Sequence, residues 1–247
     1  MTPIIIYLKK EKAKFEIMTR LCLQLFGLLF YTYSIAQSTE TITVKTGTSI
    51  SEGVPAADLY QYPQFVNGIV YFRNGTSSGA KLNYNRFLDE MQFLNTTGDT
   101  LTLDNEETIK LIIANNDSFY YDHGYFMIIS GNNSLKLAIK QGFKILDKQK
   151  TAAYDMSSSV SSIRNVNSYS SESRIYHLGV TEDVVLTREI QYYFGNKFSQ
   201  FVVANKKNLL DLYPKHATEI KKYLKETKIR FQNKEDLEKL LQYLASL

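Results

Sequence analysis

Cysteine and tryptophan are the residue types that this sequence nearly or wholly lacks. Tryptophan is absent, and Cys22 is the only cysteine among 247 residues. It lies in the apolar run Leu21–Tyr33, so a chain that has lost this N-terminal segment contains no cysteine. Disulfide bonds, thiol catalysis and cysteine-ligated metal are then excluded. A hydrophobic core must hold such a chain together, and roughly 210 residues are enough to build one.

Motifs of nucleotide-binding enzymes are missing as well. The sequence contains no P-loop and no G-x-G-x-x-G fingerprint, and we expect no hydrolase nucleophile elbow. The histidines His123, His177 and His216 do not share H-x-H or H-x-x-x-H spacing. A metal site needs convergent ligands, so we expect neither a metal nor a cofactor.

Two pairs of neighbouring residues carry groups suited to acid–base chemistry. They are Asp89 with Glu90 and Asp122 with His123. Neighbouring side chains on a strand point to opposite faces, so Asp89 and Glu90 are not expected to flank one glycosidic bond. The same objection applies to Asp122 and His123, although a turn there would relax it. We therefore expect no catalytic residue.

The N-terminal segment has the layout of a secretory signal peptide. Arg20 precedes the apolar run Leu21–Tyr33, and small residues stand at Ser34 and Ala36 before Gln37. This order predicts cleavage between Ala36 and Gln37. The protein is therefore expected to be exported, to the periplasm, to the outer membrane or into the medium.

Two other interpretations of this segment are less favoured. The apolar run is shorter than the ~20 residues that a membrane-spanning helix needs, so no stable membrane span is expected after signal removal. Cys22 lies too early for a lipoprotein cysteine, which stands at the cleavage point. Residues before Met18 form either a basic extension or the product of an upstream start at Met1.

The clearest structural pattern is a series of short strands in residues 65–103. The apolar segment Gly68–Arg73 is closed by Asn74-Gly75, a strong hairpin signal. The segments Lys81–Asn85 and Asp89–Phe93 alternate polar and apolar residues, which favours an antiparallel sheet with one wet face. The residues expected on the wet face are Lys81, Asn83, Asn85, Glu90 and Gln92.

Apolar segments and turns continue to alternate as far as Asp147, and strands return at Val184–Val203. Turn signals recur about every 8–12 residues, which is typical of all-β proteins. Residues 148–183 are rich in serine and predict a flexible loop. Residues 37–62 are polar and predict a flexible leader with one edge strand at Thr41–Lys45. The fold class expected for residues 63–204 is mainly β, as an antiparallel meander, sandwich or open barrel.

Residues 205–247 change to a helical period and predict a small C-terminal α-helical segment. Pro214 suits the first position of a helix. Asn233 with Asp236 resembles a capping pair. The apolar stripe of the last helix is Leu237, Leu240, Leu241 and Leu244.

The charges are nearly balanced outside the N-terminus. The net charge is +4, and residues 1–36 carry five basic and two acidic residues, which leaves +1 for the rest. Residues 205–247 hold ten basic and six acidic residues. We interpret them as solvated helix faces, the alternative being a docking surface for an acidic partner. No RNA-binding motif accompanies them, so nucleic acid is not an expected partner.

Four asparagines begin N-x-S/T triplets, and all four fall in predicted turns. They are Asn74, Asn95, Asn116 and Asn132. The triplets support the turn assignment more than glycosylation. The many tyrosines and phenylalanines are expected mainly in the core, although sugar and lipid binders also expose aromatic side chains.

Seven segments together resemble a group of exported, uncharacterised proteins from one lineage of Gram-negative bacteria. They lie at 68–72, 81–85, 89–93, 98–103, 206–210, 212–214 and 234–237. The resemblance extends from about residue 65 to the end, and the signal ending Ser34-Ile-Ala-Gln is similar too. It implies a location in the envelope or outside the cell, and it implies no activity.

The sequence therefore leads to two hypotheses about function. The favoured one is a non-catalytic envelope module that binds a protein or a small ligand. The alternative is a hydrolase that acts on glycans or peptides without a recognisable motif. A deep pocket with converging ionisable side chains would favour the enzyme.

Overall fold

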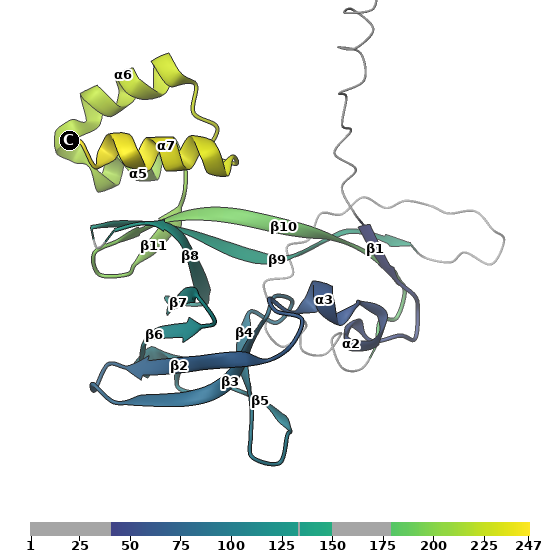
Figure 1. Ribbon diagram of the computed structural model, residues 1–247. Helices are drawn as coiled ribbons and strands as arrows, with labels where there is room; N and C mark the ends of the chain where they lie inside the picture. Colours follow the sequence, from purple (N-terminus) through teal and green to yellow (C-terminus); the bar gives the residue numbers. More distant parts are fainter. Residues whose placement is uncertain (1–40, 133, 150–178) are drawn as a thin grey trace, which may run out of the picture. The chain divides into compact units, whose positions relative to one another are not determined.

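The computed structural model of the chain describes residues of its second compact unit, Glu40–Leu247 (Figure 1). The described residues are 41–132, 134–149 and 179–247, without the side chains of 147–149. The predicted cleavage site between Ala36 and Gln37 lies outside them, as does most of the predicted serine-rich loop.

The described residues form one antiparallel sheet of 11 strands, which confirms the mainly β fold class. In chain order the strands are β1 (Thr41–Val44), β2 (Val66–Phe72), β3 (Ser77–Asn85), β4 (Glu90–Leu94), β5 (Thr100–Thr102), β6 (Ile109–Ala114), β7 (Asp117–Tyr121), β8 (Tyr125–Gly131), β9 (Leu135–Gln149), β10 (Asp183–Asn196) and β11 (Phe201–Val203).

Helices are short and occur at three places in the described part of the sequence. The helical segments are α2 (Ile50–Gly53), α3 (Ala56–Leu59), the 3₁₀ turn η1 (Glu106–Thr108), α5 (Lys206–Leu212), the 3₁₀ turn η2 (Pro214–His216), α6 (Ala217–Thr227) and α7 (Lys234–Leu244). Helices α5 to α7 confirm the predicted C-terminal helical segment.

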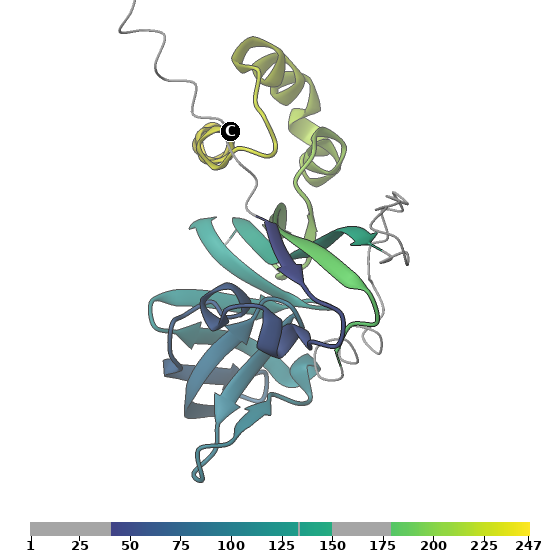
Figure 2. The same ribbon diagram turned by 90° about the vertical axis from the view of Figure 1, so that its right-hand side faces the viewer.

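The sheet consists of two meanders rather than the single one predicted. Its order is β5-β4-β3-β2-β6-β7-β8-β9-β10-β1, with β11 paired to β10. After β5 the chain passes through η1 and returns to pair β6 with β2, with Ile112 opposite Val70. The prediction of one meander was therefore wrong, because alternation identifies strands but not which strands pair. Figure 2 shows β1 along β10, where Thr41 pairs with Thr187.

The predicted hairpin turn at Asn74-Gly75 is present. Gly75 has a φ of 89°, in the region that glycine adopts without steric cost. The Asn74 Oδ1 accepts hydrogen bonds from the backbone N–H and the hydroxyl of Thr76. Asn95 and Asn132 accept from the residue two positions on in the same way. The asparagine and hydroxyl residues of these triplets therefore stabilise turns.

The edge strand predicted at Thr41–Lys45 is present as β1, whereas the residues after it, expected to be flexible, form α2 and α3. Val44 and Ile50 are fully buried, and Leu59 is nearly so. They pack with Leu186 of β10 in one hydrophobic cluster. The expectation of a flexible leader therefore does not hold for residues 41–62, because their apolar residues, although few, cover one face of β9 and β10.

Four of the five residues predicted on the solvent-exposed face of β3 and β4 are buried, and Lys81 is exposed as predicted. Asn83, Asn85, Glu90 and Gln92 are all less than 9% exposed. The segment that follows α3 contacts this face. The Asn83 amide makes hydrogen bonds with both the N–H and the C=O of Tyr62, and the Tyr60 hydroxyl donates to Gln92. The alternation was predicted correctly, but its polar face meets another polar segment rather than solvent.

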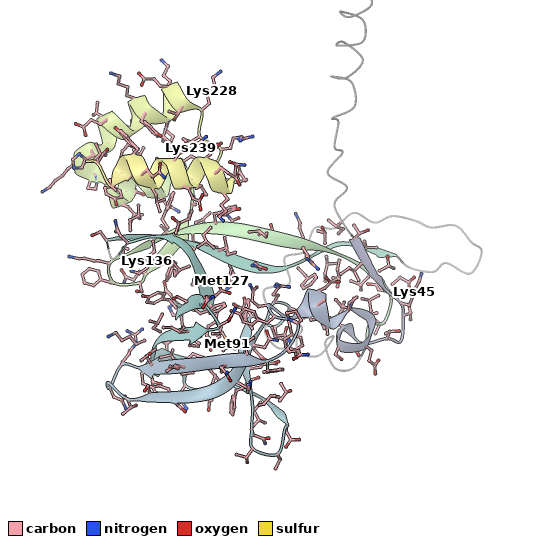
Figure 3. The ribbon with its side chains drawn as sticks, in the orientation of Figure 1. Lys45, Met91, Met127, Lys136, Lys228 and Lys239 are labelled. Atoms are coloured by element: carbon pink, nitrogen blue, oxygen red, sulfur yellow. The ribbon has the colours of Figure 1, made fainter. Side chains whose placement is uncertain are left out.

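The C-terminal helices pack on β9 and β10 through a separate cluster. The Asn233 side chain accepts a hydrogen bond from the N–H of Asp236, which confirms the predicted cap. The four predicted leucines of α7 are all buried. Lys228 and Lys239 lie on the exposed side of this segment, as Figure 3 shows. None of the helices in the described part of the chain is long and apolar enough to cross a membrane.

Candidate functional site

A hollow of about 1060 Å³ lies between the turn joining β3 to β4 and the strands β9 and β10. The β5–η1 link and the β7–β8 turn complete its wall. Its lining is mostly polar and carries both signs of charge. The ionisable residues that line it are Arg86, Asp89, Glu90, Asp104, Glu106, Tyr121, His123, Lys140, Lys144, Glu189 and Tyr193.

An ion pair holds the β3–β4 turn against β9. The Asp89 Oδ2 lies 2.5 Å from the Lys140 Nζ. The other carboxylate oxygen accepts from the Tyr84 hydroxyl at 2.7 Å and from the Tyr125 N–H at 3.2 Å. Burial raises the pKa of Asp89, while Lys140 and these hydrogen bonds act in the opposite direction. Groups from three strands, β3, β8 and β9, therefore contact the Asp89 carboxylate.

Backbone conformation makes this approach possible. Asp89 has a φ of 56°, so it belongs to a left-handed turn rather than to β4. Gly124, in the β7–β8 turn, has a φ of 137°, and a Cβ there would lie 2.6 Å from the Asp89 Oδ2 and closer still to the Lys140 Nζ. A side chain at position 124 would therefore adopt a backbone conformation that favours glycine and would displace the ion-paired groups.

The structure changes the interpretation of Asp89 and Glu90. The two carboxylates were expected on opposite faces of a strand, but both line the hollow because Asp89 lies in the turn. That expectation was wrong. The Glu90 Oε2 accepts from Gln92 at 3.1 Å and from Thr102 at 2.9 Å. Both carboxylates are therefore engaged by protein groups.

Asp122 and His123 have different surroundings. The Asp122 Oδ2 accepts from the N–H of Phe201 at 2.8 Å and so fixes the start of β11. His123 has a φ of 54° and lines the hollow. His216 contacts Glu219 on the helical segment, and His177 lies outside the described residues. Among the described residues, no group of three or more His, Cys, Asp or Glu is arranged to hold a metal.

Alternating residues of β10 supply one wall of the hollow. Glu189, Gln191 and Tyr193 line it, whereas the intervening Ile190 is 54% exposed and does not. In the register of β9 and β10, Lys140 stands opposite Gln191. Side chains of directly paired residues share a face, so Gln191 lies beside the ion-paired lysine.

The β5–η1 link supplies an acidic wall. Asp104 and Glu106 line the hollow, and neighbouring Glu107 does not. Burial raises the pKa of Tyr121, and Glu106, Glu107 and Asp89 raise it further. This side of the hollow is therefore at negative potential.

The Tyr125 hydroxyl is buried and has no hydrogen-bond partner among the described residues. Tyr125 is 1% exposed. Burial raises its pKa, and Glu106 is the strongest of the charged groups that raise it further. This group could not be predicted from the sequence, because whether a hydroxyl finds a hydrogen-bond partner depends on tertiary packing.

One five-residue pattern matches the letters of a nucleophile elbow. Residues 75–79 read Gly-Thr-Ser-Ser-Gly. An elbow needs a tight turn between a strand and a helix. Here Gly75 belongs to the hairpin turn, and Ser77 begins β3. Ser77 is exposed and does not line the hollow, so this pattern is not a catalytic motif.

Comparison with known proteins does not assign this fold or site to a family. No family model, curated protein or solved structure matches the chain. The functional conclusion is therefore drawn from the geometry of the hollow.

Proposed function

We propose that this is an exported envelope protein whose β unit is a binding module, with the hollow as its ligand site. The observation that carries the proposal is the hollow itself. Its volume of about 1060 Å³ would hold a short oligosaccharide or peptide. Its lining offers amides, carboxylates and aromatic rings, the mixture that polar ligands need for orientation and stacking.

The binding surface is preorganised. Lys140 and Asp89 hold each other in place, and Thr102 and Gln92 hold the Glu90 carboxylate. A ligand entering such a site meets side chains whose conformational entropy is already lost, which favours binding. Ordered polar side chains around an open hollow therefore support a binding role.

A hydrolase remains the second candidate, because ionisable side chains do converge in the hollow. Asp89 and Glu90 both line it. A glycosidase needs one carboxylic acid that can donate a proton and one carboxylate that can attack or activate water. Asp89 is ion-paired with Lys140, and Glu90 accepts two hydrogen bonds from protein groups. This arrangement favours binding over turnover.

Calorimetry with a panel of short glycans and peptides tests the site. The full chain is expected to bind at least one class, and Gln191→Ala is expected to weaken binding about tenfold through the loss of a buried polar contact. Ile190→Ala, one residue away on the other face, is the matched control and should bind as the parent does. Ligand turnover abolished by Glu90→Gln would favour the hydrolase instead.

Export is tested separately. Cells that express the full chain are expected to yield a protein beginning at Gln37 in the periplasmic, outer-membrane or medium fraction. Mass spectrometry of the N-terminus identifies the first residue of the exported protein directly. An unprocessed chain in the cytoplasmic fraction would contradict export and leave the binding proposal untouched.

A further inference from the structure

The part of β9 that lines the hollow contributes consecutive residues, whereas β10 contributes alternate ones. Lys140–Ile145 all line the hollow, but from β10 only Glu189, Gln191 and Tyr193 do so. Alternate residues indicate that a strand presents one face, since successive side chains point to opposite faces. A consecutive run indicates that β9 presents its edge, with its backbone toward the hollow.

This edge of β9 has no paired strand. On the side of β8 the register ends at Met127 with Ile139, and no described strand pairs with β9 beyond that point, although β10 continues along the other side (Figure 1). Tyr125, two positions before Met127 in β8, donates its N–H to the Asp89 carboxylate instead of to β9. The turn that carries Asp89 therefore takes the place that β8 would occupy.

Two residues of this stretch direct their backbone N–H and C=O groups toward the open edge. The Tyr192 C=O accepts from the N–H of Ala204, so Tyr192 turns its backbone groups away from β9. Directly opposite residues of an antiparallel pair point either toward each other or away, and the direction alternates along a strand. Ile139, opposite Tyr192, therefore points to the side of β8, and Gln141 and Phe143 point the same way.

The space beside this backbone is open. Gly142 has no side chain, and among the described residues a Cβ added there would meet only the Arg86 carbonyl oxygen, at 3.7 Å. The hollow follows β9 from Lys140 to Ile145, a length of about 20 Å for an extended strand. An extended segment of similar length can therefore lie against this edge.

The open edge distinguishes between classes of polar ligand. Its backbone groups recur at every second residue, and an extended peptide has the same repeat, so the two can pair through main-chain hydrogen bonds. The main chain of a glycan carries no such amide groups. A second folded copy would have to bring the edge of a whole sheet into a hollow walled by the β3–β4 and β7–β8 turns. A single extended peptide is therefore the occupant that fits.

We propose that the open edge of β9, at Lys140–Ile145, binds an extended peptide as an additional strand of the sheet. The inference rests on the proposed function of the hollow as a ligand site, and it names the ligand class as peptide rather than glycan. Gln141 and Phe143 exchange main-chain hydrogen bonds with the peptide. The side chains around the hollow then contact those of the peptide and determine which sequences bind.

Amide hydrogen exchange of the full chain, with and without a peptide, tests the pairing residue by residue. The probe is a hexapeptide of alternating threonine and valine with blocked ends, which has high strand propensity and no charge. Its addition is expected to slow exchange at Gln141 and Phe143 by at least about tenfold. The amides of Lys140 and Gly142 point to β10 and are expected to change much less. Equal slowing at all four amides would contradict pairing at this edge.

Two matched changes separate main-chain pairing from side-chain contacts. N-methylation of every residue of the hexapeptide removes its N–H donors and keeps its side chains, and calorimetry is expected to show at least about tenfold weaker binding. Gln141→Pro removes an N–H that points to the open edge, where proline is tolerated. It is expected to bind the hexapeptide at least about tenfold more weakly than Gln141→Ala, which loses the same side chain but keeps the N–H. Should Gln141→Pro fail to fold, the N-methylated peptide decides the question.

Failure of this inference is distinct from failure of the proposed function. Equal binding of the hexapeptide and its N-methylated form would overturn main-chain pairing, and a loss of that binding in Gln191→Ala would still leave the hollow as a binding site. No binding of the hexapeptide would also overturn the inference, and binding of a glycan from the panel would then support the proposed function without it. A dimer in analytical ultracentrifugation that dissociates in Gln141→Pro would identify a second copy as the occupant and overturn the inference.

Discussion

Lys140, in the middle of β9, forms an ion pair with Asp89, which lies in the turn between β3 and β4. The pair joins the two meanders of the sheet at a point remote from β2 and β6, where they are paired in register. Both residues also line the hollow. One contact therefore joins the two meanders and forms part of the wall of the hollow.

Lys140→Met should destabilise the protein by about 1–2 kcal/mol. The substitution leaves the Asp89 carboxylate without its cation, and the side chains are only 29% and 27% exposed, so solvent compensates in part. Denaturant unfolding measures the loss. Lys144→Met is the matched control, since Lys144 lines the same hollow without a salt bridge among the described residues. An equal loss in both variants would contradict a special role for the ion pair.

Tyr125→Phe should stabilise the protein by about 1 kcal/mol, because it removes a buried hydroxyl that has no partner and keeps the ring. Tyr84→Phe removes a hydroxyl from a similarly buried ring, but this hydroxyl donates to Asp89 at 2.7 Å. That variant should lose about 1–2 kcal/mol. Thermal unfolding of the two variants side by side gives the comparison, and shifts of the same sign would count against it.

Asn83→Ala should cost about 2–4 kcal/mol. The amide bridges the N–H and the C=O of Tyr62, and both groups would be left buried without a partner. Lys81→Ala, at an exposed position of the same strand, should change the free energy of unfolding by less than about 0.5 kcal/mol. A cost for Asn83→Ala as small as that for Lys81→Ala would show that this face of β3 is solvated after all.

Asp183 should make stability depend on acid pH. Lys45 and the backbone N–H of Thr46 lower the pKa of Asp183 from 3.8 to about 2. As the pH falls, Asp183 is therefore protonated at a higher pH in the unfolded chain than in the folded chain. The stabilisation that ionised Asp183 contributes is complete above about pH 5 and is lost as the pH falls toward 2. The gap in unfolding midpoint between the parent and Asp183→Asn should narrow over that range. A gap of constant size from pH 7 to pH 2.5 would refute the linkage.

The sequence was a good guide to local structure. Asn74-Gly75 predicted a hairpin because few residue pairs adopt positive φ readily, and Asn233 predicted a helix start because its side chain satisfies a free N–H. The leucines of α7 were predicted as buried because they share one helical face. These features depend on residues close together in sequence.

Pairing and burial over long sequence distances could not be predicted. Nothing in the alternation of β6 indicates that it pairs with β2 rather than with β5. The polar residues Asn83 and Gln92 were expected in water, because their partners Tyr62 and Tyr60 lie in a segment whose sequence suggests a loose leader. The hollow was missed for the same reason, since Asp89, Glu106 and Gln191 meet only through the tertiary fold.

The most direct test is to map ligand-induced changes in backbone amide NMR shifts on the full chain, with the best-binding glycan or peptide of the panel. The largest changes are expected at Glu106, Tyr121, Lys140, Gln191 and Tyr193, which surround the hollow. They should be reduced in Gln191→Ala and retained in Ile190→Ala. Changes centred on α5 to α7, with those five residues unaffected, would contradict the hollow as the binding site.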